Sequence, residues 1–328
     1  MDNRSGIKKI FRYKGMTLLF ALIVVIVFFW LINNSYLTMI NIRGMMNAAS
    51  LAGTLAVGIG CLLISGNVNL AAGAEGMLGG VLVALLIKGG MPWPLAVILI
   101  LLAGAVAGLF TAFLVNKLNF MAFIATIGLS SVYQGLGYII TGSENVAISN
   151  EAFYKLGSTL ILGIPLPFVI MTALFIIYGV ILSSTRFGRK IYMCGGNRNA
   201  ARLAGINPKK VTTILFMNSS AISALGGCIL ASRMHAGAPS GVLGYEFDAI
   251  TAAVLGGIAF MGGSGGMLGC FLGLMLIAAV NNGLQAINVQ AYWQITFQGL
   301  LLLLALTLDY FNERSRQKAL RAKDNTAF

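Results

Sequence analysis

A few polar side chains inside or beside apolar stretches are the residues of this sequence that could do chemistry. They are carboxylates and amides: Asn69, Glu75, Glu246, Asp248, Asn281 and Asn282. Ionisable groups at membrane depth are costly and are functional candidates by default, and amides can bind the hydroxyl groups of a passing solute. These residues are therefore candidates for lining a pathway for a small hydrophilic solute.

Each of these residues also has a structural interpretation, and the sequence leaves both interpretations open. Glu75 could complement the helix dipole in the first turn of a span, where negative charge is favourable. Glu246 and Asp248 could cap the helix that follows them. Asn281 and Asn282 could hold neighbouring helices together by hydrogen bonds.

Catalytic and metal-binding chemistry has no support in the sequence. No Ser-His-Asp set, pair of catalytic acids or metal-ligand spacing occurs where a shared cavity could form. The four cysteines are far apart, and the single histidine, His235, cannot build a metal site alone. The glycine cluster at residues 262–266 lacks the Lys-Ser/Thr of a phosphate-binding loop. We expect neither an enzyme nor a bound cofactor or metal, and no ATP hydrolysis by this chain alone.

The overall composition indicates that lipid is the main solvent. Of the 328 residues, 58% are hydrophobic and 9% are charged, whereas a soluble domain carries about 25% charged residues. So few charges cannot coat a surface that faces water. The composition predicts an all-α polytopic membrane protein with one membrane domain at residues 16–308, between a basic N-terminus at 1–15 and a basic tail at 309–328.

Ten apolar segments are candidates for membrane spans, which need about 20 residues each. They are Met16–Ile32, Met45–Ile64, Ala74–Ile87, Pro94–Val115, Phe120–Ile140, Leu160–Leu182, Val211–Ala231, Ala249–Met261, Met267–Leu284 and Tyr292–Leu308. The third and eighth segments are short, so they are either half-helices or helices that extend through less apolar flanks. Four of the six prolines lie between the segments or at the first residue of one, and Pro165 and Pro167 lie within the first eight residues of Leu160–Leu182; proline is tolerated near the start of a helix.

Three basic clusters predict the orientation in the membrane. They lie at residues 4–14, 186–210 and 314–323. Lys and Arg gather on the cytoplasmic side of membrane spans, and ten spans place all three clusters on that side. We therefore expect cytoplasmic termini, and we assign the net charge of +13 to topology rather than to nucleic acid binding.

Several glycines have the spacing of helix contacts in membranes. Gly104 and Gly108 form one pair, and Gly265, Gly269 and Gly273 form a longer ridge. Small residues four apart allow the backbones of two spans to approach closely. We predict that these glycines pack helices together.

The basic loop at residues 183–210 has more predicted structure than is needed to set the orientation in the membrane. Its sequence predicts a short helix that is opened by Asn197 as an N-cap and closed by Gly205. A rigid helix on the cytoplasmic face could bind another protein and move with it as one unit.

The pattern Asn199-Ala200-Ala201-x-x-x-Gly205 resembles the Glu-Ala-Ala-x-x-x-Gly coupling signature of ABC importer permeases, with Asn in place of Glu. Other segments resemble the ribose-type (monosaccharide and branched-chain amino acid) permeases in the same order and spacing. These segments are residues 192–206, 244–250, 254–257 and 281–284. The resemblance assigns coupling to an ATPase to Gly195, Gly196, Asn197, Asn199, Ala200, Ala201 and Gly205.

This resemblance implies the permease subunit of an ATP-driven importer in a bacterial plasma membrane, moving a monosaccharide such as ribose inward by alternating access. It implies a homodimer or a pair with a similar permease, cytoplasmic ABC ATPase domains that use ATP and Mg, and an extracytoplasmic solute-binding protein. The alternative hypothesis is a self-contained ion-coupled carrier or channel. It requires functional charges within the spans, for which Glu75 is the only candidate.

Two details bear on the substrate and on internal symmetry. Relatives usually carry Ile-Asp-Leu-Ser-Val-Gly where this chain has Val-Asn-Leu-Ala-Ala-Gly at 68–73. If Glu75 lines the pathway, the substrate could therefore differ from that of the ribose branch. Aligning residues 77–80 with 254–257 sets Asn69 opposite Glu246, on segments of opposite orientation. This match fits an inverted repeat of spans 2–5 and 7–10, but it is short enough to be chance.

Overall fold

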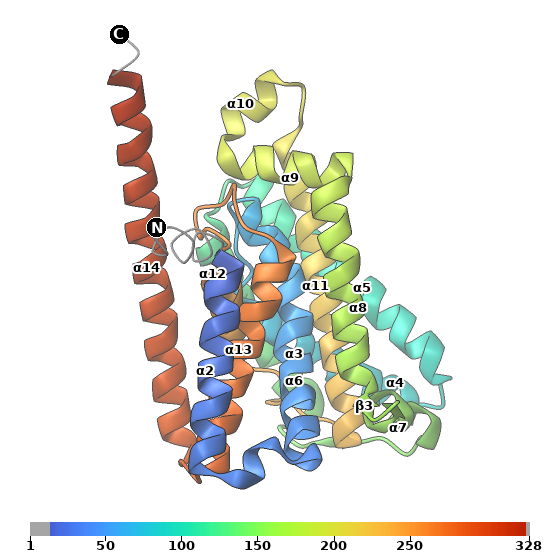
Figure 1. Cartoon of the computed structure of the whole chain (residues 1–328). Coiled ribbons are helices and arrows are strands. Elements are labelled where there is room, and N and C mark those ends of the chain that lie inside the picture. The colour runs from blue at the N-terminus through green and yellow to red at the C-terminus, as the bar shows by residue number, and fades with distance from the viewer. Residues whose placement is uncertain (1–13, 326–328) are drawn as a thin grey trace.

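The computed structural model describes residues 14–325 of the chain. The basic N-terminus predicted at residues 1–15 lies almost wholly outside the described residues, as does the end of the predicted tail at 326–328. The described residues are almost entirely helical, with four strands of two residues each (Figure 1). This confirms the predicted all-α class.

The elements below are given in chain order. They are α2 Lys14–Ile32, η1 Asn34–Leu37, α3 Met39–Ile64, α4 Ala72–Lys88, α5 Trp93–Asn116, α6 Ala122–Thr141, β1 Val146–Ala147, α7 Glu151–Ser158, β2 Leu160–Ile161, β3 Ile164–Pro165, α8 Leu166–Ser184, α9 Arg186–Gly196, α10 Arg198–Leu203, α11 Pro208–Met234, β4 Ala236–Gly237, α12 Tyr245–Leu255, α13 Met267–Ala286 and α14 Ala291–Asn325. Strand β1 pairs antiparallel with β4, and β2 pairs antiparallel with β3.

Each of the ten predicted segments overlaps one helix. Seven helices within the described residues are long and apolar enough to cross a membrane: α3, α5, α6, α8, α11, α13 and the first part of α14. The apolar part of α2, Met16–Ile32, is slightly shorter. The two segments expected to be short are α4 with 17 residues and α12 with 11. The chain is therefore a multi-pass membrane protein.

Two predicted span boundaries are wrong. The sixth segment is predicted from Leu160, but residues 160–165 form the β2–β3 hairpin, and α8 begins at Leu166. The eighth segment is predicted to reach Met261, but α12 ends at Leu255. Gly257 takes a φ of +87°, which a right-handed helix does not allow, and residues 256–266 form an irregular loop.

The loops gather at two ends of the helix bundle. At one end, which we call the coupling end, α9 and α10 lie over the linkers 65–71 and 256–266 (Figure 1). The backbone N–H of Gly263 there donates to the carbonyl of Ile64 at 2.8 Å. At the opposite end lie η1, α7 and the paired strands. Each loop thus lies on the side that ten alternating spans predict.

Burial divides the helices into an inner and an outer group. Most of α3, α4 and α12 is buried, whereas α5, α6, α8 and α14 turn long rows of Leu, Ile, Val and Phe side chains outward. An apolar exterior of this extent fits a surface that lipid covers. The inner helices α4 and α12 are shorter than the spans around them, and the first turn of α4 is buried inside the protein together with Glu246 and Asp248 of α12.

Small residues bring the helices into close contact, as the sequence predicts. A Cβ atom on Gly108 would lie 2.3 Å from a backbone atom of α11, and one on Gly273 would lie 2.3 Å from a backbone atom of α12. A Cβ atom on Gly104 would lie 2.8 Å from the backbone of Ser220 in α11, and one on Gly269 would lie 2.0 Å from the backbone of Gly256, the residue after α12. Gly265 does not belong to this ridge, because it lies in the loop before α13 with a φ of +113°.

The helix contacts follow the pairing that an inverted repeat would give. Helix α11 packs against α4 and α5, and its counterpart α3 packs against α12 and α13. Likewise α6 packs against α4, and α14 packs against α12. The first residues of α4 and α12 meet in the interior. This correspondence supports the repeat of spans 2–5 and 7–10 over a chance match.

Candidate functional site: a coupling helix and an interior polar network

Helix α10, the predicted coupling helix, has the caps that the sequence predicts. The side chain of Asn197 accepts hydrogen bonds from the backbone N–H groups of Asn199 at 2.9 Å and Ala200 at 3.0 Å. Gly205 follows the helix with a φ of +75°, a conformation that glycine adopts without strain. Two end groups that sequence alone could identify therefore delimit this helix.

The two faces of α10 differ sharply. Ala201 is fully buried and belongs to the main hydrophobic core, so it seats the helix on the membrane domain. Leu203 is 91% exposed, and Asn199 and Ala200 are exposed beside it. Leu203 thus lies on the open side of α10, beside residues that the resemblance assigns to coupling. Sequence reasoning missed Leu203, although its apolar type among basic and polar neighbours was the available signal.

Helix α9 is fitted against the end of α3 through glycine. A Cβ atom on Gly195 would lie 1.9 Å from the carbonyl oxygen of Ile64, and Gly196 lies against Gly263 of the 256–266 loop. Burial raises the pKa of the Cys194 thiol, which favours the unreactive protonated form. These residues therefore hold α9 in place and leave α10 to face outward.

A buried polar network connects the 65–71 linker with α4 and α11. Asn69 is fully buried, and its Nδ2 donates to Oε2 of Glu75 at 2.9 Å. The hydroxyl of Ser220 on α11 donates to Oε1 of the same carboxylate at 2.7 Å. Asn69 also accepts from the backbone N–H of Ala71 at 3.0 Å, which sets the turn into α4. Both carboxylate oxygens of Glu75 thus have hydrogen-bond donors.

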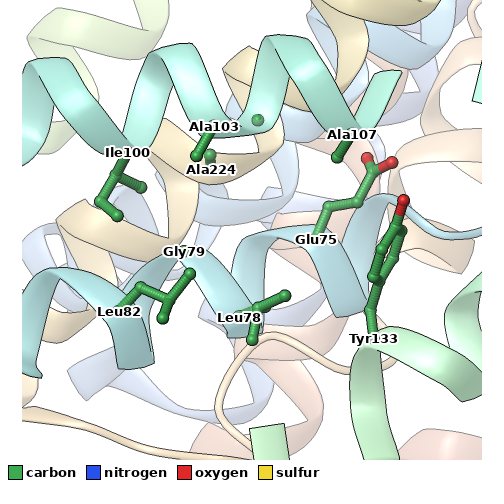
Figure 2. Close-up of a pocket in the computed structure, with 10 residues that line it drawn as sticks. Glu75, Leu78, Gly79, Leu82, Ile100, Ala103, Ala107, Tyr133 and Ala224 are labelled. Carbon is green, nitrogen blue, oxygen red and sulfur yellow. The ribbon is translucent and has the colours of Figure 1, made fainter. Parts of the chain in front are cut away.

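Glu75 also borders a pocket between α4, α5, α6 and α11. Figure 2 shows the Glu75 carboxylate and the Tyr133 hydroxyl turned toward each other at one end of it. The pocket is partly open; its volume is about 340 Å³ when the space open to the outside is included, and it is otherwise lined by apolar or small residues. Only 5% of Glu75 is exposed. The structure places Glu75 in the first turn of α4, as the dipole interpretation requires, and at a cavity as well.

Glu246 and Asp248 lie at the start of α12 and point to different neighbours. Glu246 accepts from the backbone N–H of Gly244 at 2.9 Å, and its carboxylate packs on Gly73, where a Cβ atom would lie 1.9 Å from Oε2. Asp248 accepts a hydrogen bond from the Gln298 side chain of α14. The two carboxylates therefore join α12 to α4 and to α14.

The two asparagines of α13 also separate. Asn282 exchanges hydrogen bonds with Asn41 of α3 at 2.7 and 3.1 Å, as the helix-joining interpretation predicts. Asn281 is partly exposed. Four of the six candidate pathway residues thus lie near the starts of α4 and α12. The other two, Asn281 and Asn282, lie apart from them on α13.

Helix α6 carries polar residues on its open face, which sequence reasoning missed. Ser131 is exposed near the middle of the helix, and Gln134 is partly exposed one turn later. Gly128 and Gly135 on this face have open space where a Cβ would stand. Polar groups at mid-membrane are costly when lipid covers them. The signal was the polar group of residues 130–134 inside a predicted span.

The buried face of α6, opposite the open one, adjoins the segment before α12. Leu129 and Tyr133 of α6 share a hydrophobic cluster with Leu243, which lies just before α12. Phe247 is exposed on α12, next to the Asp248 bond to α14. Within residues 14–325 no three His, Cys, Asp or Glu side chains lie together as metal ligands would.

The comparison with known families identifies the family to which this chain belongs. Residues 41–306 match the family described as the branched-chain amino acid transport system / permease component, which is most of the chain. The chain belongs to this permease family. The family consists of transport permeases rather than of catalytic subunits, in agreement with the sequence analysis.

Individual relatives align with this permease over most of the length of both chains. The ribose import permease protein RbsC of Bacillus subtilis is 34% identical over 291 residues, which is 88% of this chain and 90% of the relative. The L-arabinose transport system permease protein AraH of Escherichia coli is 34% identical over 317 residues, 94% of each chain. No solved structure gives a significant match.

Proposed function

We propose that this permease is the membrane subunit of an ATP-driven importer that moves a monosaccharide, of the size of ribose or arabinose, into the cell by alternating access. One observation carries this proposal: residues 41–306 match a permease family, and the same chain has a capped helix, α10, with exposed residues at one end of the bundle. The names of the relatives support a pentose substrate. The sparse polar groups fit weak binding of a hydroxylated solute.

The coupling end is proposed to face the cytoplasm of a bacterium, in its plasma membrane. The basic residues of α9 to α11 and of the tail support this orientation by the positive-inside rule, and both termini then lie in the cytoplasm. A partner ABC ATPase would bind α10 and use ATP and Mg, because this chain has no nucleotide-binding loop. A solute-binding protein would deliver sugar at the opposite end, over α7 and the paired strands.

A second copy of the chain is proposed to cover the open polar face of α6. The support is physical: the amide of Gln134 is partly exposed at mid-membrane, where lipid offers it no hydrogen bond, and the exposed hydroxyl of Ser131 has only a 3.5 Å bond to the carbonyl of Ile127. Two such faces opposed in a homodimer would enclose a polar channel. Phe247 offers a ring for the apolar face of a sugar, and hydroxyl and amide groups bind its hydroxyls.

Changing this face tests the proposed pathway. The double substitution Ser131→Leu and Gln134→Leu is expected to lower sugar uptake by the reconstituted complex about tenfold, because two polar contacts with the solute are lost. Ser183→Leu, an exposed serine at the end of α8, serves as the control and should leave uptake within about twofold. Equal uptake by all three proteins would contradict the assignment of α6 to the pathway.

The ion-coupled carrier remains the second candidate, because Glu75 is a carboxylate beside a cavity at membrane depth. Glu75→Gln separates the two functions. A glutamine can accept from Asn69 and donate to Ser220, so we expect ATP-driven uptake within about twofold of the unchanged protein. Ion coupling at Glu75 predicts instead that the variant loses uptake and that a gradient alone drives the unchanged chain. Uptake into vesicles with and without ATP measures both.

A further inference from the structure

Arg198, the first residue of the coupling helix α10, reaches back into the membrane domain. Its Nη2 donates to Oδ1 of Asn67 at 2.9 Å, across 131 positions of sequence. Asn67 is 6% exposed and lies in the 65–71 linker between α3 and α4. A hydrogen bond between a charged donor and a buried acceptor is stronger than one between neutral groups.

The linker around Asn67 is short and tightly held. Nδ2 of Asn67 donates to the hydroxyl of Ser65 at 3.1 Å, and that hydroxyl donates to the last turn of α3 at Leu62 at 2.7 Å. Only Gly66 within the linker is exposed. A displacement of Asn67 therefore acts on the linker as a whole.

The other end of the linker leads directly to the interior network. Asn69 follows Asn67 by two residues, so the two side chains are connected by at most about 7 Å of backbone. Asn69 donates to Glu75 at 2.9 Å, and Glu75 binds Ser220 of α11. The same turn contains Gly73, on which Glu246 of α12 packs. A path of short contacts thus runs from α10 to the meeting point of α4 and α12.

A second contact between the coupling loop and α3 has different properties. Gly195 rests on the carbonyl of Ile64 through backbone packing alone. Such a contact holds α9 and α3 as one body, because close-packed backbones do not slide without separating. The bond between Arg198 and Asn67 joins two side chains and can lengthen or break while the helices remain packed.

We infer that the Arg198–Asn67 bond transmits movement of the coupling helix to α4, by way of the 65–71 linker and the Asn69–Glu75 bond. This inference rests on the proposed function, in which an ATPase moves α10. Arg198 and Asn67 are positioning residues: they determine where α4 begins relative to α12 and touch neither nucleotide nor sugar. The two starting turns at Gly73 and Glu246 are the elements whose separation changes between transport states.

The test compares variants in the complete complex with its ATPase and binding protein, reconstituted in vesicles. Asn67→Ala removes the acceptor behind the coupling helix, and Arg198→Ala removes the donor. Asn116→Ala is the matched control, because this amide also bonds across the coupling end, to the carbonyl of Lys209 at 3.1 Å and to Thr213, but does not contact α10 through these bonds. Basal ATPase activity, sugar-stimulated ATPase activity, uptake and thermal unfolding are measured for each.

We expect Asn67→Ala to keep basal ATPase activity and thermal unfolding near those of the unchanged protein while uptake per ATP falls about tenfold, as for a lost charged hydrogen bond. The double variant should be no worse than the more affected single variant, since both remove one bond. Asn116→Ala should keep its uptake per ATP.

Two results would overturn the inference. One is uptake per ATP by Asn67→Ala within twofold of the unchanged complex. The other is a parallel loss of stability and of all activities, which indicates a structural role alone. Failure of the proposed function is distinct, because the unchanged complex itself would then show no ATP-dependent sugar uptake.

Discussion

Replacing Leu203 by glutamate is expected to release the ATPase from this permease and to abolish ATP-driven uptake. Leu203 is 91% exposed on α10, so the membrane domain does not need it to fold. If the side chain fills an apolar site on the ATPase, a buried and unpaired carboxylate would cost several kcal/mol of binding free energy, which is a loss of affinity of more than about a hundredfold. Co-purification of the two subunits in detergent measures this affinity.

The same substitution at the other end of the molecule provides the control. Leu162 is 99% exposed in the β2–β3 hairpin, so Leu162→Glu changes the charge equally without touching the coupling end. This variant should bind the ATPase normally. Retention of the ATPase by Leu203→Glu at the level of the control would refute the assignment of α10 as the docking helix.

The second large effect concerns the contact between α4 and α11. A Cβ atom on Gly227 would lie 1.7 Å from the backbone oxygen of Gly76 and 2.9 Å from the nitrogen of Gly80. Gly227→Leu must therefore separate two helices whose backbones touch. We expect a loss of at least about 3 kcal/mol of stability, and little folded protein in the membrane.

A glycine with open surroundings is the reference for that substitution. Gly44 lies in α3 with no atom within 4 Å of its expected Cβ, so Gly44→Leu should be tolerated. Thermal unfolding and the monodisperse yield from size-exclusion chromatography compare the two variants. Equal unfolding temperatures would show that α4 and α11 are not held together as described.

Features that depend on neighbouring residues were predictable from the sequence. The Asn197 cap and Gly205 define α10 because both act within one turn of the helix. The apolar segments predicted the spans because each helix must provide its own backbone hydrogen bonds in lipid. The β2–β3 hairpin was missed because Leu160 and Ile161 continue the apolar pattern of the following helix, although they are not part of it.

Features that depend on distant residues were not predictable. The sequence identified Asn69 and Glu75 as candidates, but nothing in their spacing reveals that Ser220 completes the network across 145 positions. The bond of Asn67 to Arg198 likewise exists only because the chain folds back on itself. Exposure distinguishes Leu203 from the other leucines, and exposure is a property of the fold. The roles predicted for the coupling and pathway residues remain predictions.

Uptake of labelled pentose into sealed vesicles tests the central claim most directly. The vesicles would contain this permease with its ATPase, and the binding protein would be supplied on the side opposite α10. We predict accumulation that requires ATP on the α10 side, the ATPase and the binding protein together, and none by the permease alone. Full-rate accumulation by the permease alone, without ATP, would contradict the proposed function.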